Sequence, residues 1–95
     1  MVNYIVIDYS AKRKEKWIYG DITVARKYAI DILEHGNVDC VPILDPKKPV
    51  FDTYREVGVV APDYRISGKR TGRVVWLPAS GGKKVLTRNG TIRRS

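Results

Sequence analysis

The sequence predicts a single α+β domain, in which a small, mainly antiparallel sheet carries one packed amphipathic helix. Only the segment at about 22–35 repeats its apolar residues at helical spacing. Short runs rich in β-branched and aromatic residues precede and follow it, and glycine, proline and asparagine separate them, which is typical of strands and turns. A chain of 95 residues with 43% hydrophobic content suits one modest core, so residues 1–95 are expected to form one domain.

Two strands are predicted before the helix. Residues 3–9 form a short β-branched run that ends in a charged connection. Residues 16–19, around Trp17, can return beside the first run as a second strand. The connection is then a hairpin loop that exposes three cations at its tip, Lys12, Arg13 and Lys14.

The helix at 22–35 has recognisable signals at both ends. Asp21 or Thr23 can cap the free N–H groups of its first turn. Gly36 follows the last apolar position and can take the left-handed conformation that commonly ends a helix. His35 lies in the last turn, where the partial negative charge of the helix end favours a cation, so a structural role is preferred to a catalytic one.

The middle of the chain is predicted as short strands separated by breaks. Pro42 indicates an edge or irregular strand, because proline cannot donate to a ladder. The predicted elements are a strand over 38–44, a surface turn over 45–49, a short helix or extended chain over 50–57, a buried strand over 57–60, a break over 61–63, strands over 64–67 and 73–77 joined by 68–72, and a flexible loop over 78–82.

Asn89-Gly90 predicts a C-terminal β-hairpin, since both residues accept positive φ. A two-residue turn would pair residue 88 with 91 and residue 86 with 93. Alternation would then place one set of side chains toward solvent, namely Lys84, Leu86, Arg88, Thr91 and Arg93. The opposite set would pack on the core, namely Val85, Thr87 and Ile92.

Charge is unevenly distributed along the chain. Every acidic residue lies in the first 63 positions, and residues 1–66 carry as many acids as bases, so the net charge of +8 lies in the last 29 residues. The neutral α+β part covers about 1–63, and the basic β-rich part covers about 64–95. The basic part has too little apolar content to fold independently. A segregated charge of this kind attracts polyanions.

The interpretation favoured by this charge is a small, non-enzymatic nucleic-acid-binding protein that contacts the phosphate backbone. The predicted phosphate-binding residues are Lys69, Arg70, Arg73, Lys84, Arg88, Arg93 and Arg94. Tyr64 and Trp76 are candidates for stacking on unpaired bases, although Trp76 alternates with Val74 and is expected more often in the core. Contacts of this kind hold phosphates without selecting bases, and they leave DNA, RNA and strand type open.

Two other classes of function remain open. Basic residues also blunt exposed sheet edges, and the basic face could meet an acidic protein surface. The chain would then be a viral or prokaryotic protein with a role in assembly, in protein–protein interaction or as an inhibitory accessory subunit. It could also form a homodimer by pairing through a sheet edge. The least favoured alternative is a metal-dependent nuclease that uses Asp8, which lies at the end of the first strand. A solvated strand end explains Asp8 more simply.

No cofactor or metal site is predicted. The chain has one cysteine and one histidine, which are too few for a structural zinc site, and Cys40 is expected to be a small buried apolar group. No apolar run reaches the roughly 18–20 residues of a membrane helix, so a soluble, cytoplasmic protein is expected.

Residues 68–77 are loosely similar to the loop and strand of small ribosomal and transcription-factor barrels that bind RNA. The glycine-basic pattern of these ten residues is common, so it assigns no family.

Overall fold

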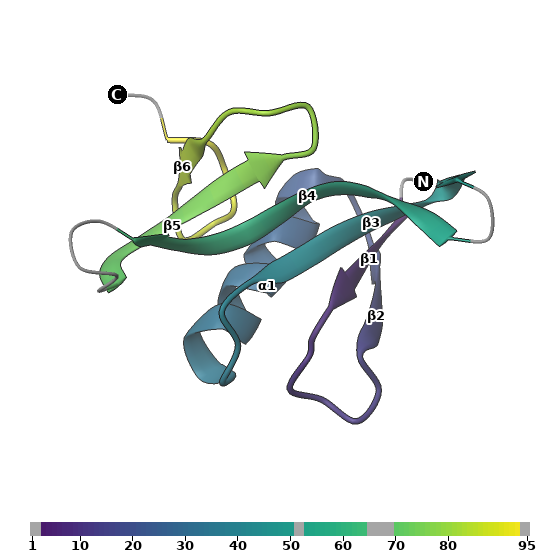
Figure 1. Ribbon diagram of the computed structural model, residues 1–95, viewed down its shortest axis with the longest axis horizontal. Helices are drawn as coiled ribbons and strands as arrows, with labels where there is room; N and C mark the ends of the chain where they lie inside the picture. The colour runs from purple at the N-terminus through teal and green to yellow at the C-terminus, as the bar shows by residue number, and fades with distance from the viewer. Residues whose placement is uncertain (1–2, 51–52, 65–69, 94–95) are drawn as a thin grey trace.

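The computed structural model describes residues 3–50, 53–64 and 70–93, with the backbone alone at 48–50, 64 and 70–72. Within these residues, one six-stranded sheet has the order β2-β1-β3-β4-β5-β6, with antiparallel pairing between all neighbours, and one helix packs on it (Figure 1). The predicted α+β fold is confirmed. Its elements are β1 (Asn3–Ile7), β2 (Glu15–Tyr19), α1 (Ile22–His35), β3 (Val41–Val50), β4 (Thr53–Tyr64), β5 (Arg70–Pro78) and β6 (Lys84–Leu86).

The N-terminal hairpin and the helix agree with the sequence prediction. β1 pairs with β2 from Asn3↔Tyr19 to Ile7↔Glu15. The Asp21 side chain accepts a hydrogen bond from the Val24 N–H at 3.1 Å, which satisfies one free donor of the first turn of α1. The predicted left-handed glycine is wrong, because Gly36 is extended at φ −95° and instead donates its N–H to the Ile32 carbonyl.

The middle of the chain forms two long strands where the sequence predicts several short ones. β3 and β4 pair along most of their length, so the predicted turn over 45–49 and break over 61–63 are wrong. Irregular registers at Ile43/Leu44 and Asp45/Pro49 absorb the residues that do not fit the ladder. Pro42 lies in β3, which is an interior strand. The residue pairs that join β1 to β3 involve Ile43 and Leu44, so Pro42 lies beyond them and needs no N–H for a bond to β1.

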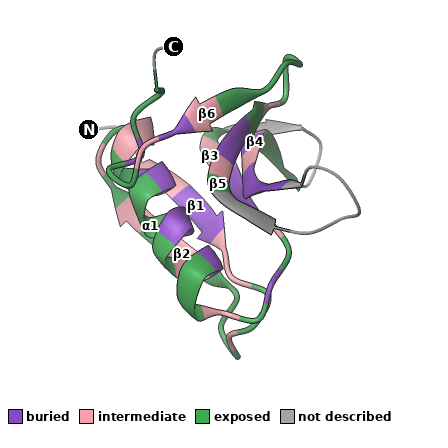
Figure 2. Cartoon of the chain, turned by 90° about the vertical axis from the view of Figure 1, so that its left-hand side faces the viewer, coloured by how far each residue is buried: buried purple, intermediate pink, exposed green. Residues whose placement is uncertain are grey.

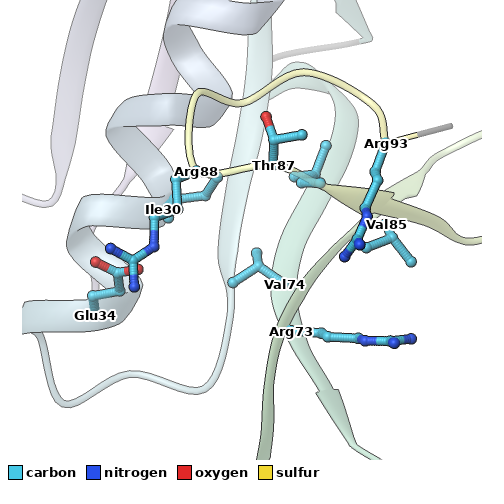
Figure 3. A pocket seen from close by; sticks show the side chains of 9 residues that line it. Ile30, Glu34, Arg73, Val74, Val85, Thr87, Arg88 and Arg93 are labelled. Carbon is cyan, nitrogen blue, oxygen red and sulfur yellow. The ribbon is translucent and has the colours of Figure 1, made fainter.

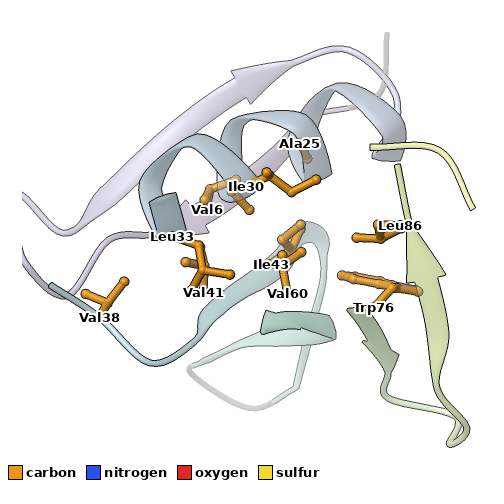
Figure 4. Close-up of a cluster of buried hydrophobic side chains, with 11 residues drawn as sticks. Val6, Ala25, Ile30, Leu33, Val38, Val41, Ile43, Val60, Trp76 and Leu86 are labelled. Carbon is orange, nitrogen blue, oxygen red and sulfur yellow. The ribbon is translucent and has the colours of Figure 1, made fainter. Parts of the chain in front are cut away.

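The core lies between α1 and one face of the sheet (Figure 4). It comprises Val6, Ala25, Ala29, Ile30, Leu33, Val38, Val41, Ile43, Val60, Trp76 and Leu86. Arg26 is also buried, at 6% exposure, and its guanidinium lies 5.3 Å from the centre of the Trp76 ring. Trp76 also requires glycine at position 58, because a Cβ on Gly58 would come within 2.5 Å of the indole.

Figure 2 shows that the connecting loops are largely exposed, whereas buried residues concentrate on the strands and α1.

The face of the sheet that α1 does not cover is called the open face here. Alternation along the paired strands places Ile5, Ala61 and Val75 on it, opposite the core residues Val6 and Val60. These three side chains are nevertheless only 0%, 8% and 2% exposed. The open face is therefore partly enclosed by the protein itself.

The C-terminal hairpin is present, but its register differs by one residue from the predicted one. Leu86 pairs with Ile92, and the Thr87 N–H donates to the Thr91 carbonyl at 2.8 Å. Three residues therefore separate the paired threonines, and the last of them, Gly90, has φ 83°. Leu86 is 6% exposed and joins the core, so its burial decides the register.

Gly90 also attaches the hairpin to the helix. A Cβ at this position would lie 2.5 Å from the Thr23 carbonyl oxygen and 2.7 Å from the Lys27 nitrogen. Only a glycine allows the turn to approach the first turns of α1 this closely. The hairpin is consequently docked along α1 within the fold.

Candidate functional site

A pocket of about 280 Å³ lies where the second half of α1 meets β5 and the C-terminal hairpin (Figure 3). It is called the arginine pocket here, because three arginines from separate stretches of the chain line it. Its lining residues are Ile30, Glu34, Arg73, Val74, Val85, Leu86, Thr87, Arg88 and Arg93. Two helix residues four positions apart, Ile30 and Glu34, form its helical wall.

Each arginine is positioned by a different backbone element. Arg73 is on β5, where alternation places it on the same face as Val75, the partner of Val85. The Arg93 N–H donates to the Val85 carbonyl at 2.7 Å, so the two residues lie opposite each other in the hairpin. Residues that lie opposite each other in a ladder have their side chains on the same face. Arg88 lies in the turn, and Figure 3 shows it extending toward Glu34, while Arg73 and Arg93 lie on the side of Val85.

Basic side chains outnumber acidic ones among the residues that line the pocket. Three guanidinium groups line it against one carboxylate, that of Glu34, and all four residues are exposed. The Thr87 and Thr91 hydroxyls lie 2.7 Å apart, which ties the two sides of the hairpin together beside the pocket. A guanidinium offers several N–H donors in a planar fork that matches phosphate geometry, so this arrangement can hold an exposed anion.

The structure brings together three of the seven predicted phosphate-binding residues: Arg73, Arg88 and Arg93. Lys84 is exposed, but alternation along β6 places it with Leu86, on the face opposite to that of Val85. The predicted stripe of Lys84, Arg88 and Arg93 on one face is therefore wrong, because it depended on the two-residue turn. Of the other predicted residues, Lys69 and Arg94 lie outside the described residues, and the side chains of Arg70 and Tyr64 lie outside the described part of the chain.

Trp76 belongs to the core, which is the assignment that its sequence pattern favoured. Its side chain is 5% exposed, between Val60 and Leu86 in the cluster of Figure 4. A base cannot stack on a ring that other side chains already cover, so Trp76 is unsuitable as a stacking platform in this conformation.

Lys83 has a structural role among the basic residues. Its ammonium group lies 3.1 Å from Oδ1 of Asp63, whose side chain is 4% exposed. A buried carboxylate is stable only when it is paired or hydrogen-bonded, and Lys83 supplies that pairing from the loop before β6. Part of the basic charge of the last third thus balances an acid of the sheet.

Asp8, the candidate nuclease residue, organises its own loop. Its Oδ1 accepts hydrogen bonds from the Ser10 N–H at 3.0 Å and the Ser10 hydroxyl at 2.6 Å. A hollow of about 350 Å³ nearby is lined by Asp8, Ser10, Tyr28, Asp31, Ile32, His35 and Gly36. Within the described ranges, no group of three or more His, Cys, Asp or Glu side chains is arranged to hold a metal ion.

Comparison of the chain with protein-family models, curated proteins and solved structures found no match. The described segments contain no helix with the length and apolar character needed to cross a membrane.

A second hollow, of about 520 Å³, lies at the opposite edge of the sheet and was not predicted as a site. It is lined by Lys12, Arg13, Lys14, Glu15 and Trp17 and is called the basic hollow here. The sequence places the three cations at a loop tip, but it contains no signal that connects them to a functional aromatic residue. Glu34 of the arginine pocket was missed for a similar reason, because nothing local links the helix to the hairpin.

Proposed function

We propose that this chain is a non-enzymatic nucleic-acid-binding protein whose phosphate contacts centre on Arg73, Arg88 and Arg93. The observation that carries the proposal is that all three line the arginine pocket, Arg88 on the side of Glu34 and Arg73 and Arg93 on the side of Val85. Arginine pairs with phosphate through parallel N–H···O bonds, and these contacts require no particular base. The excess of +8 in charge would add long-range attraction to a polyanion.

The test is a fluorescence-anisotropy titration of labelled single-stranded DNA, duplex DNA and RNA at two salt concentrations. Neutralising phosphates releases counterions, so we expect a log–log slope of affinity against salt of roughly −3 to −6. A triple variant, Arg73→Gln with Arg88→Gln and Arg93→Gln, should bind more weakly, and its slope should be shallower by about 2 to 3.

A charge-matched control separates the pocket from the overall charge. Lys27→Gln, Lys47→Gln and Arg55→Gln remove three exposed cations that do not line the arginine pocket. This control variant should bind nucleic acid only slightly more weakly than the unmodified chain, because its net charge is lower. Equal losses in the two triple variants would contradict the assignment of the pocket. Absence of binding to every nucleic acid at ~50 mM salt would contradict the function itself and favour an acidic protein partner.

A further inference from the structure

Three exposed aromatic side chains lie on β2 and at the start of β4, and two of them, Trp17 and Tyr54, are in contact. Trp17, Tyr19 and Tyr54 are 46%, 69% and 41% exposed, although large apolar rings are usually more buried than this. Trp17 and Tyr19 alternate onto the open face of β2 with Ile5, the partner of Trp17. The Trp17 and Tyr54 rings touch edge to face, with 6.1 Å between centroids, so they form one continuous aromatic surface.

Cations border this aromatic surface at the basic hollow. Lys12, Arg13 and Lys14 line the hollow together with Trp17, and the lining includes one acid, Glu15. The loop that carries them is held in shape, because the Asp8 N–H donates to the Lys14 carbonyl at 2.8 Å. The Asp8 carboxylate accepts the two Ser10 hydrogen bonds within the same loop.

We propose that the surface formed by Trp17, Tyr19 and Tyr54 binds unpaired bases of a single-stranded nucleic acid. The phosphates between those bases would then lie against Lys12, Arg13 and Lys14. Exposed aromatic rings beside a cationic groove are the combination that holds single strands, because every base has a face that can stack and every linkage has a charge. In a duplex the bases are paired and stacked, so this surface discriminates against double strands.

The proposed surface is separate from the arginine pocket. It involves β2, which is one edge strand of the sheet, whereas the pocket involves the hairpin at β6, the other edge. The inference rests on the proposed affinity for nucleic acid, but it assigns the preference for single strands to different residues. The two assignments can therefore fail independently.

Intrinsic fluorescence tests the proposal directly. The chain has two tryptophans, and Trp76 is 5% exposed, so a change on binding reports mainly on Trp17. A short oligothymidylate should quench this fluorescence, whereas an abasic strand of equal length, which retains the phosphates, should not. Trp17→Leu and Tyr54→Leu should each weaken oligothymidylate binding roughly 5- to 150-fold, the usual effect of losing one stacked base. Duplex affinity should stay within about twofold of the unmodified chain.

Tyr28→Leu is the matched control, since Tyr28 is 39% exposed but lies on α1. Circular dichroism of the three variants checks the helix content, and the quenching experiment needs no variant at all. Equal weakening of single-strand and duplex binding would overturn the proposal, as would equal quenching by the abasic strand. If only the arginine-pocket variant loses binding, this inference fails and the proposed function stands. Conversion of a dimer to a monomer by Trp17→Leu, without an effect of oligothymidylate, would assign the surface to self-association and overturn the proposal.

Discussion

The rings of Trp17 and Tyr54 meet edge to face at an interplanar angle of 85°, although β1 and β3 lie between their strands in the sheet. Neighbouring strands are about 4.8 Å apart, so strands three positions apart are too distant for such a contact in a flat sheet. The sheet must therefore curl toward its open face at this end. The irregular registers at Ile43/Leu44 and Asp45/Pro49 supply the bend, since bulges increase local twist. The same curl explains the complete burial of Ile5 on the open face.

A double-mutant cycle should detect the contact between the two rings. Trp17→Leu and Tyr54→Leu, alone and combined, should show a coupling free energy of about 0.5–1.5 kcal/mol in urea unfolding. The coupling arises because either single variant already removes the interaction. Trp17→Leu combined with Tyr28→Leu should be additive within about 0.5 kcal/mol. A Trp17–Tyr54 coupling of zero would show that the sheet is not curled in this way in solution.

Gly90→Ala should loosen the C-terminal hairpin from α1. A Cβ would collide with the Thr23 carbonyl and the Lys27 nitrogen, and the positive φ adds strain, so we expect a destabilisation of about 1–3 kcal/mol. Amide chemical shifts should change mainly in residues 84–93 and the start of α1. Affinity for nucleic acid should fall, because Arg88 and Arg93 would lose their positions.

The control for Gly90 is Gly81→Ala. Gly81 also has a positive φ, of 105°, but nothing lies within 4 Å of the position that its Cβ would take. The substitution therefore measures the backbone strain without the collision. Equal effects of the two substitutions on stability would contradict the docking of the hairpin on the helix.

Lys83→Met should destabilise the fold without removing a phosphate contact. The substitution removes the Lys83 ammonium group from the Asp63 carboxylate, which is 4% exposed, and so removes one charged hydrogen bond from a buried acid. We expect a loss of about 1 kcal/mol in the free energy of unfolding, because the 56% exposure of Lys83 weakens the pair through solvent screening. Lys84→Met, at the exposed neighbouring position, should have almost no effect in the same urea titration. If Lys83→Met weakens nucleic-acid binding as much as an arginine-pocket variant does, its role is not structural alone.

Stability should decrease at alkaline pH because of Tyr4. Burial, followed by the charges of Asp45 and Asp21, raises the pKa of Tyr4 above its usual value of 10.0. The folded chain therefore holds the phenol proton more tightly than the unfolded chain. Its contribution to stability is fully present below pH 10.0 and is lost as the pH rises from there through the higher folded-state pKa.

Tyr4→Phe removes the titrating group, so its free energy of unfolding should fall less between about pH 9 and 11 than that of the unmodified chain. Tyr9→Phe, at a position that is 54% exposed, is the control. Urea titrations across this pH range provide the measurement. Parallel curves for the unmodified chain and Tyr4→Phe would contradict the raised pKa.

The helix was predictable to the residue because its signals are local. Apolar spacing, the Asp21 cap and the break after His35 all lie within one stretch of chain. The β1–β2 hairpin was predictable for the same reason. The basic residues of the candidate site, Arg73, Arg88 and Arg93, could be proposed from the sequence alone, because their charge is a property of composition. Their common pocket was not, since it depends on the hairpin register that the burial of Leu86 decides.

By itself, the sequence determined the fold class, the helix, the presence of the C-terminal hairpin and the concentration of positive charge in the last third. These features follow from periodicity, turn chemistry and composition, each of which acts over a few residues. Tertiary structure alone decided that β3 and β4 continue through prolines, that Trp17 reaches Tyr54, and which cations share a pocket. The physical reason is that ladder hydrogen bonds and burial couple residues far apart in the chain, and this coupling overrides weak local preferences.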